Sequence, residues 1–164
     1  MALASRFFGD WDAVYAADSG LGGVYEAGLR ADFVIGDMDS LEDDSLLSSF
    51  YPEQIIRSPR DKDLTDTELA MDRMRKNGIT EIVLIGGDGG RMDHFFALER
   101  LFSRDNPPVM WIGATTLCLM LEGGSARNAV SVQGLAGQDV SVFPVEGGRY
   151  QMHAEGLIWP IDGL

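Results

Sequence analysis

Short apolar runs alternate with helical segments through the N-terminal two thirds of the chain, and this alternation constrains the fold more than any other feature. Runs such as residues 12–17 and 81–87 have the length and composition of buried strands. The stretch from 63 to 77 is the strongest helical segment, because Thr65 can cap it and Glu68 completes a capping box. Strands that alternate with helices predict a mostly parallel α/β sheet.

The remaining elements define where this α/β part ends. Further helices are predicted at 21–28, 42–51 and 91–104, and further strands at 33–36 and 54–59. From Pro108 onward the helical period disappears, and short β-like runs are separated by Gly, Asn and Ser turns. We therefore predict an α/β domain over residues 1–106 and an all-β domain of the sandwich type over 107–164, incomplete because no closing strand follows the last apolar run.

The charge balance narrows the possible partners. Of 164 residues, 26 are acidic and 13 are basic, which gives a formal net charge of −13. Nucleic acids and anionic membrane surfaces are bound by clustered Lys and Arg, so we expect neither partner. The sequence has no apolar run long enough to cross a membrane and no signal-peptide pattern, and the lone Cys118 excludes an internal disulfide. We expect a cytoplasmic protein.

Acidic residues gather where strands end or helices begin: Asp18, Asp37, Asp39, Asp63, Asp66 and Asp93. In parallel α/β sheets, ligands bind at the carboxyl ends of the strands. Any one of these acids also suits a helix cap or a solvated loop, but several converging carboxylates repel one another unless a cation neutralises them. Oxygen ligands completed by phosphates are what Mg²⁺ prefers, so the pattern predicts a magnesium site at this edge of the sheet.

The stretch GGDGGRMDH, from Gly86 to His94, has the complementary chemistry. Its glycines let backbone N–H groups approach an anion closely, and Arg91 offers a fork of donors to a phosphate. The alternative is a flexible turn with a surface arginine. The pattern is neither a P-loop nor a GxGxxG dinucleotide motif.

The ordered motifs ADSG, GDMDSL, DKDLTDTELA, GGRMDH and GLIWP resemble the thiamine pyrophosphokinase family over most of the chain, from about Ala13 to Pro160. The resemblance implies an α/β catalytic domain, a C-terminal β-sandwich and a homodimer. It also implies that ATP and thiamine are the substrates and that thiamine diphosphate and AMP are the products.

The resemblance assigns roles to individual residues. The implied Mg²⁺ ligands are Asp18, Asp37, Asp39 and Asp66. The implied nucleotide contacts are Asp18, Lys62, Asp63, Gly89, Gly90 and Arg91. The implied catalytic residues are Asp37, Asp39, Asp66, Arg91 and Asp93, and the base for the thiamine hydroxyl stays open among Asp39, Asp66 and Asp93. The implied thiamine contacts are Trp159, by stacking across the dimer interface, and His153, which stands where the family usually has Ser or Thr.

Two alternatives remain. Phosphatases of the haloacid-dehalogenase type also place a DxD motif after an apolar strand, which FVIGDMDS imitates, although the GGRMDH turn is then unexplained. A protein that binds nucleotide or thiamine with little turnover is the second alternative, because the N-terminal strand expected before Trp11 is shortened or lost.

Overall fold

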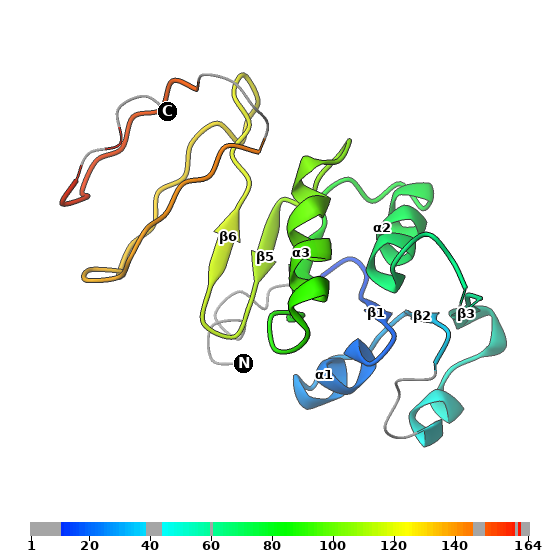
Figure 1. Cartoon of the computed structure of the whole chain (residues 1–164). Helices are drawn as coiled ribbons and strands as arrows, with labels where there is room; N and C mark the ends of the chain where they lie inside the picture. Colours follow the sequence, from blue (N-terminus) through cyan, green and yellow to red (C-terminus); the bar gives the residue numbers. More distant parts are fainter. Residues whose placement is uncertain (1–10, 39–43, 60, 146–149, 160, 162–164) are drawn as a thin grey trace. The chain divides into compact units, whose positions relative to one another are not determined.

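The computed structural model in Figure 1 describes residues 11–38, 44–59, 61–145, 150–159 and 161. The chain divides into two compact units, Met1–Leu121 and Glu122–Leu164. The helices and strands all lie in the first unit as far as the described residues show, and each unit is described separately below.

The first sheet has three parallel strands in the order β1-β2-β3. Their bounds are β1 Tyr15–Ala17, β2 Phe33–Gly36 and β3 Ile55–Arg57. The predicted strands at 12–17, 33–36 and 54–59 are therefore confirmed in shorter form. A buried core forms against this sheet around Leu21 and Val34, neither of which has measurable solvent exposure.

Helix α1 (Gly20–Glu26) connects β1 to β2 and carries Leu21 into this core. Two short 3₁₀ helices, η2 (Asp44–Ser49) and η3 (Pro52–Gln54), lie between β2 and β3. The helix predicted at 42–51 is thus a 3₁₀ helix in its described part. Its serines explain the difference, because Ser48 and Ser49 donate hydrogen bonds to carbonyls three residues earlier and so favour tight turns.

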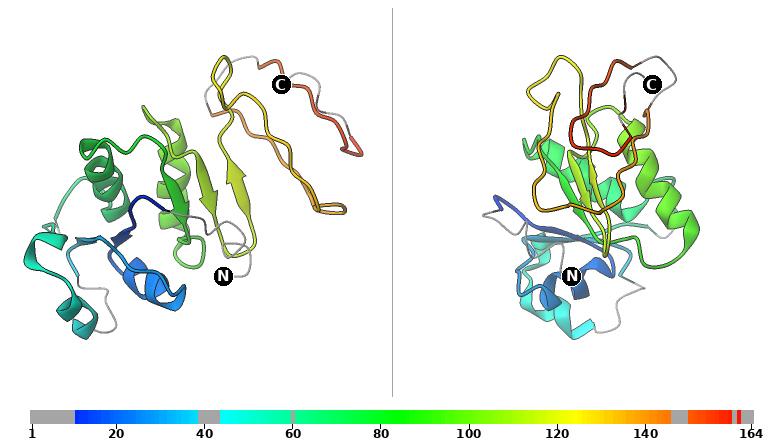
Figure 2. Two further views of the ribbon diagram at one scale, coloured as in Figure 1. Left: turned by 180° about the vertical axis from the view of Figure 1, so that it is seen from behind. Right: turned by 90° about the vertical axis from the view of Figure 1, so that its left-hand side faces the viewer.

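The second sheet contains β4 (Val83–Ile85), β5 (Met110–Ile112) and β6 (Leu117–Leu119). Strands β4 and β5 are parallel, whereas β5 and β6 are antiparallel. Figure 2 shows the two sheets standing apart, with β1 and β4 as their facing members. Strands β1, β2 and β3 therefore have the parallel neighbours that the sequence predicted, and β4 pairs in parallel with β5, a run that the sequence had assigned to the all-β domain.

Two helices pack on these sheets. Helix α2 (Asp66–Lys76) begins with the predicted capping box: the Thr65 hydroxyl accepts from the Glu68 N–H at 3.2 Å, and the Glu68 carboxylate accepts from the Thr65 N–H at 2.6 Å. Helix α3 (Met92–Arg100) continues into the 3₁₀ helix η4 (Leu101–Ser103).

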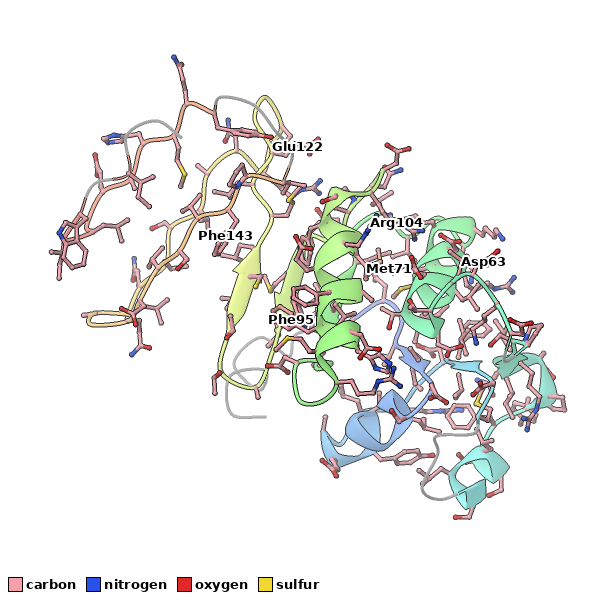
Figure 3. The ribbon with its side chains drawn as sticks, in the orientation of Figure 1. Asp63, Met71, Phe95, Arg104, Glu122 and Phe143 are labelled. Carbon is pink, nitrogen blue, oxygen red and sulfur yellow. The ribbon has the colours of Figure 1, made fainter. Side chains whose placement is uncertain are left out.

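Helix α2 links the two sheets. It packs on β1 and β2, while its Met71 belongs to a second buried cluster with Ile82, Leu98, Leu101 and Trp111. Figure 3 shows Met71 on the side of α2 that is turned toward α3. Each of these large apolar side chains stabilises the fold by about 1.5–3 kcal/mol when fully buried, so the cluster holds β4 and β5 against both helices.

The predicted C-terminal β-sandwich is not confirmed. Strands β5 and β6 follow the predicted boundary at 106/107, yet they pair with β4 and belong to the first unit. The described residues of Glu122–Leu164 contain no helix or strand, and large apolar side chains there remain in solvent: Phe143 is 81% exposed and Ile158 is 87% exposed. A sandwich needs two sheets that bury each other's inner faces, and these residues provide neither.

Among the described residues, no helix combines the length and the hydropathy needed to span a membrane.

Candidate functional site

One cavity of about 1210 Å³ lies in the first unit, along the carboxyl ends of β1, β2 and β4 and the beginnings of α2 and α3. Five of the residues singled out from the sequence line it: Asp18, Asp37, Lys62, Asp66 and Arg91. Residues from four separate stretches of the chain therefore meet at one edge, where open α/β sheets bind ligands.

Asp18 directly follows β1 and is held in a strained conformation. Its backbone is left-handed, with a φ of 48°, while its N–H donates to the Ile35 carbonyl at 2.8 Å. Gly36 makes this close approach possible, because a Cβ at Gly36 would lie 3.1 Å from the Cβ of Asp18. The Oδ1 atom of Asp18 is buried and accepts no hydrogen bond from the described residues. A buried carboxylate oxygen without a donor is costly, and a bound cation would compensate for it.

Asp66, the first residue of α2, is bound to two polar neighbours. The Lys62 ammonium lies 3.0 Å from its Oδ1, and the Ser58 hydroxyl donates to the same oxygen at 3.0 Å. Lys62 also donates to the Ser58 hydroxyl at 2.9 Å. The side chains of Lys62 and Asp66 are only 15% and 20% exposed, so this three-membered network is shielded from solvent.

The GDMDSL motif is described only in part. Asp37 is half-buried at the end of β2 and lines the cavity. Met38 is buried with a left-handed φ of 65°, a second non-glycine outlier at this edge. Asp39 lies outside the described residues, so its pairing with Asp37 stays a prediction.

The glycine-rich turn carries an exposed ion pair. Two nitrogens of the Arg91 guanidinium donate to the two carboxylate oxygens of Asp93. This hydrogen bonding raises the pKa of Arg91 and holds the pKa of Asp93 below its ordinary value. Asp93 is 60% exposed and does not line the cavity, nor do Asp63, Gly89 and Gly90. Of the predicted anion-binding groups in this turn, Gly86, Gly87 and Arg91 line the cavity, as do Asp88 and His94 of the same stretch.

Three further residues were not predicted as part of the site. Ser58 bridges Lys62 and Asp66, and its position directly after β3 was the available signal. Asp88 lines the cavity and accepts the Ala114 N–H at 2.7 Å, which fixes the loop after β5. His94, to which the sequence analysis assigned no role, also lines the cavity.

The structure describes no complete metal centre. Within the described residues, no three His, Cys, Asp or Glu side chains are grouped closely enough to hold a metal ion. The carboxylates of Asp18, Asp37 and Asp66 still fit Mg²⁺ by chemistry, since the unpartnered oxygen of Asp18 is a hard ligand at the cavity wall.

The implied thiamine contacts lie in the second unit. The indole of Trp159 is 80% exposed. The Nε2 atom of His153 lies 3.5 Å from a carboxylate oxygen of Glu155.

Comparison with known proteins gives one family. Residues 5–109 match the protein family described as "Thiamin pyrophosphokinase, catalytic domain". None of the curated proteins compared with the chain matches it.

Three solved structures of similar sequence carry related names. A thiamin pyrophosphokinase from Geobacillus thermodenitrificans is 30% identical over 65% of this chain and 51% of its own, with a TM-score of 0.49. A probable thiamine pyrophosphokinase from Staphylococcus saprophyticus is 30% identical over 67% and 56%, with a TM-score of 0.49. A thiamin pyrophosphokinase family protein from Enterococcus faecalis is 33% identical over 51% and 40%, with a TM-score of 0.44. The matched region thus spans about half the length of these structures. Because the catalytic-domain description covers more than half of the sequence, the chain belongs to the thiamin pyrophosphokinase family.

Proposed function

We propose that this protein transfers a pyrophosphoryl group from ATP to the hydroxyl of thiamine, which yields thiamine diphosphate and AMP. The observation that supports this most directly is that Asp18, Asp37, Lys62, Asp66 and Arg91 line one cavity in a chain of this family. Carboxylates and cationic side chains on one wall are what a metal-bound polyphosphate requires.

The acids would hold the metal. We assign Mg²⁺ to Asp18, Asp37 and Asp66, together with Asp39 from beyond the described residues. When bound, the ion supplies charge neutralisation and polarisation of phosphate oxygens. Asp18 is ready for this role, since its buried Oδ1 has no hydrogen bond to give up.

The cationic residues would hold the phosphates. Lys62 lines the cavity, and its ammonium is paired with Asp66. A bound phosphate could replace Asp66 as the partner of this ammonium. Arg91 can offer its guanidinium fork to the nucleotide after leaving Asp93. We also assign nucleotide contacts to Asp63, Gly89 and Gly90, which requires their loops to move toward the cavity.

The reaction needs one proton transfer. The thiamine hydroxyl loses its proton to a carboxylate, its oxygen bonds to the β-phosphorus, and the bond from that phosphorus to the α–β bridging oxygen breaks, so AMP leaves with the electron pair. Asp39, Asp66 and Asp93 remain the candidates for the base. Asp66 lines the cavity and has to be freed from Lys62 before it can accept a proton.

We assign thiamine binding to Trp159 and His153, in a cytoplasmic homodimer. A thiazolium cation on the face of an indole is stabilised by about 0.5–2 kcal/mol, and Trp159 presents that face to solvent. Its replacement, Trp159→Ala, should raise the KM for thiamine without changing the KM for ATP.

An AMP-release assay with Mg²⁺ and ATP, in the presence and absence of thiamine, tests the proposal. We expect AMP only when thiamine is present, and loss of most of the rate in Asp18→Asn. The matched control is Asp105→Asn, an exposed acid that does not line the cavity, which should retain the full rate. AMP release that does not depend on thiamine would contradict the proposal.

The same assay addresses the two alternatives. The phosphatase alternative is not favoured by the family match, and it would release free phosphate from a phosphoester without nucleotide. A protein with little turnover would bind Mg-ATP and thiamine in calorimetry and release no AMP.

A further inference from the structure

Ser58 connects the end of β3 to the polar network at the cavity wall. Its N–H donates to the Gly36 carbonyl at 3.0 Å, which fixes its backbone to the last residue of β2. Its hydroxyl donates to Oδ1 of Asp66 at 3.0 Å and accepts from the Lys62 ammonium at 2.9 Å. Lys62 lies in the loop before α2, and Asp66 is the first residue of that helix. Ser58 therefore holds two charged side chains of a separate segment to the first sheet.

The end of β2 also fixes the other acids that line the cavity. Gly36 leaves room for the close approach of Asp18, whose N–H donates to a β2 carbonyl at 2.8 Å. Asp37 follows Gly36 directly and lines the cavity. The sheet thus positions these two acids through its own backbone, whereas it reaches the ion pair at the start of α2 through the side chain of Ser58.

The hydroxyl of Ser58 can keep Asp66 when Lys62 changes partner. A hydroxyl has one O–H donor and two acceptor lone pairs. In Ser58 the donor serves Asp66 and a lone pair serves Lys62, so the bond to Asp66 does not require Lys62 to stay. The Asp66 side chain is only 20% exposed, and a shielded carboxylate that lost both of these partners would be costly.

We propose that Ser58 is a positioning residue for nucleotide binding: its hydroxyl holds the Asp66 carboxylate at the cavity wall while Lys62 exchanges Asp66 for a phosphate. This inference rests on the proposed function, which supplies the phosphate. Before the exchange Lys62 and Ser58 share the carboxylate, and after it Ser58 alone of the two holds it. The hydroxyl therefore contributes more to the bound state than to the free state, and only such a difference changes the affinity.

Calorimetric titration with Mg-ATP, in the absence of thiamine, tests this role. Ser58→Ala should raise the dissociation constant about tenfold or more, because it removes a hydrogen bond to a charged group. Ser58→Thr keeps the hydroxyl, so its dissociation constant should stay within about threefold of that of the unmodified protein. The matched control is Ser48→Ala, which removes an exposed hydroxyl that donates to the Ser45 carbonyl. Neither residue lines the cavity, so this control should bind Mg-ATP with unchanged affinity.

Steady-state kinetics of AMP release separates positioning from a purely structural role. A serine that merely stabilises the fold would, when replaced, affect the KM values for both substrates or for neither. Ser58→Ala should raise the KM for ATP and leave the KM for thiamine within about twofold, because its hydroxyl contacts only residues assigned to the nucleotide and the metal. The variant should fold, since Lys62 and Asp66 still pair directly at 3.0 Å. If it does not fold, Ser58→Cys replaces it, because a thiol is a weak donor.

The outcomes distinguish this inference from the proposed function. An unchanged dissociation constant in Ser58→Ala, an increase of the same size in Ser58→Thr, or a parallel rise in the KM for thiamine would overturn the role of Ser58, even if the unmodified protein forms AMP. If the unmodified protein binds Mg-ATP and releases no AMP with thiamine, the proposed activity fails, and the dissociation constants still decide the role of Ser58. If the unmodified protein does not bind Mg-ATP, both fail.

Discussion

The shielded ion pair between Lys62 and Asp66 allows a quantitative test of how the site is held together. At the observed separation of 3.0 Å, two unit charges in an effective dielectric of about 20 attract each other by roughly 5.5 kcal/mol. Residual solvent screening and rearrangement of the neighbouring groups in each single variant reduce the part of this attraction that a double-mutant cycle measures. We therefore expect a net coupling of about 1–3 kcal/mol between the two side chains.

A double-mutant cycle measures this coupling. The free energy of unfolding is determined by urea denaturation for the unmodified protein, Lys62→Met, Asp66→Asn and the double variant. Each single variant should be destabilised, because it leaves its partner half-buried with a weaker contact to Ser58, and the double variant should be less destabilised than the sum. The control cycle on Arg91 and Asp93, whose side chains are 72% and 60% exposed, should show a smaller coupling, because solvent screens an exposed pair. A coupling below about 0.5 kcal/mol for Lys62 and Asp66 would place that pair in the same class as an exposed one and refute the reasoning.

Three further predictions concern the core, the glycine-rich turn and the thiol. Leu21→Ala should lower the free energy of unfolding by about 2–5 kcal/mol in urea denaturation, since Leu21 is fully buried, whereas an effect below about 1 kcal/mol would mean that the core collapses to fill the space. Arg91 lowers the pKa of Asp93, so the stabilisation from this ion pair should be fully present above the ordinary Asp pKa and lost as the pH falls through the lowered pKa. NMR titration of the Asp93 carboxyl carbon measures this pKa, which should be higher in Arg91→Gln than in the unmodified protein. Burial, with a smaller contribution from Asp88, raises the pKa of the Cys118 thiol, so iodoacetamide should modify it more slowly than a free cysteine at mildly alkaline pH, and equal rates would contradict this.

The helices and strands that depend on interactions between residues close in the sequence could be predicted from the sequence. Helix α2 was predictable because the reciprocal bonds of Thr65 and Glu68 are specified within four residues. Strands β1 to β5 were predictable as apolar runs between turns, although their described lengths are only three or four residues. Strands β5 and β6 were predicted as β runs of the all-β domain, whereas they form one sheet with β4, because this pairing depends on tertiary contacts rather than on composition.

The site was predictable to the extent that strand ends identify it. Asp18 and Asp37 follow β1 and β2, so the topology alone brings them to one edge. The state of Asp66 was not predictable, because its contacts with Lys62 and Ser58 depend on the path of the loop before α2. The orientation of Arg91 toward Asp93 was equally hidden, since residues two positions apart at the start of a helix can adopt several rotamers.

Among the described residues, β1 and β4 each end a three-stranded sheet, and such sheet edges influence how a protein behaves when it is concentrated. An exposed strand edge is a template for pairing with another chain, and natural proteins oppose such pairing with charge. The formal net charge of −13 gives every copy the same sign, so repulsion should keep copies dispersed in dilute buffer. Salt screens that repulsion over a length of about 10 Å at 0.1 M, so turbidity at high protein concentration should increase with ionic strength.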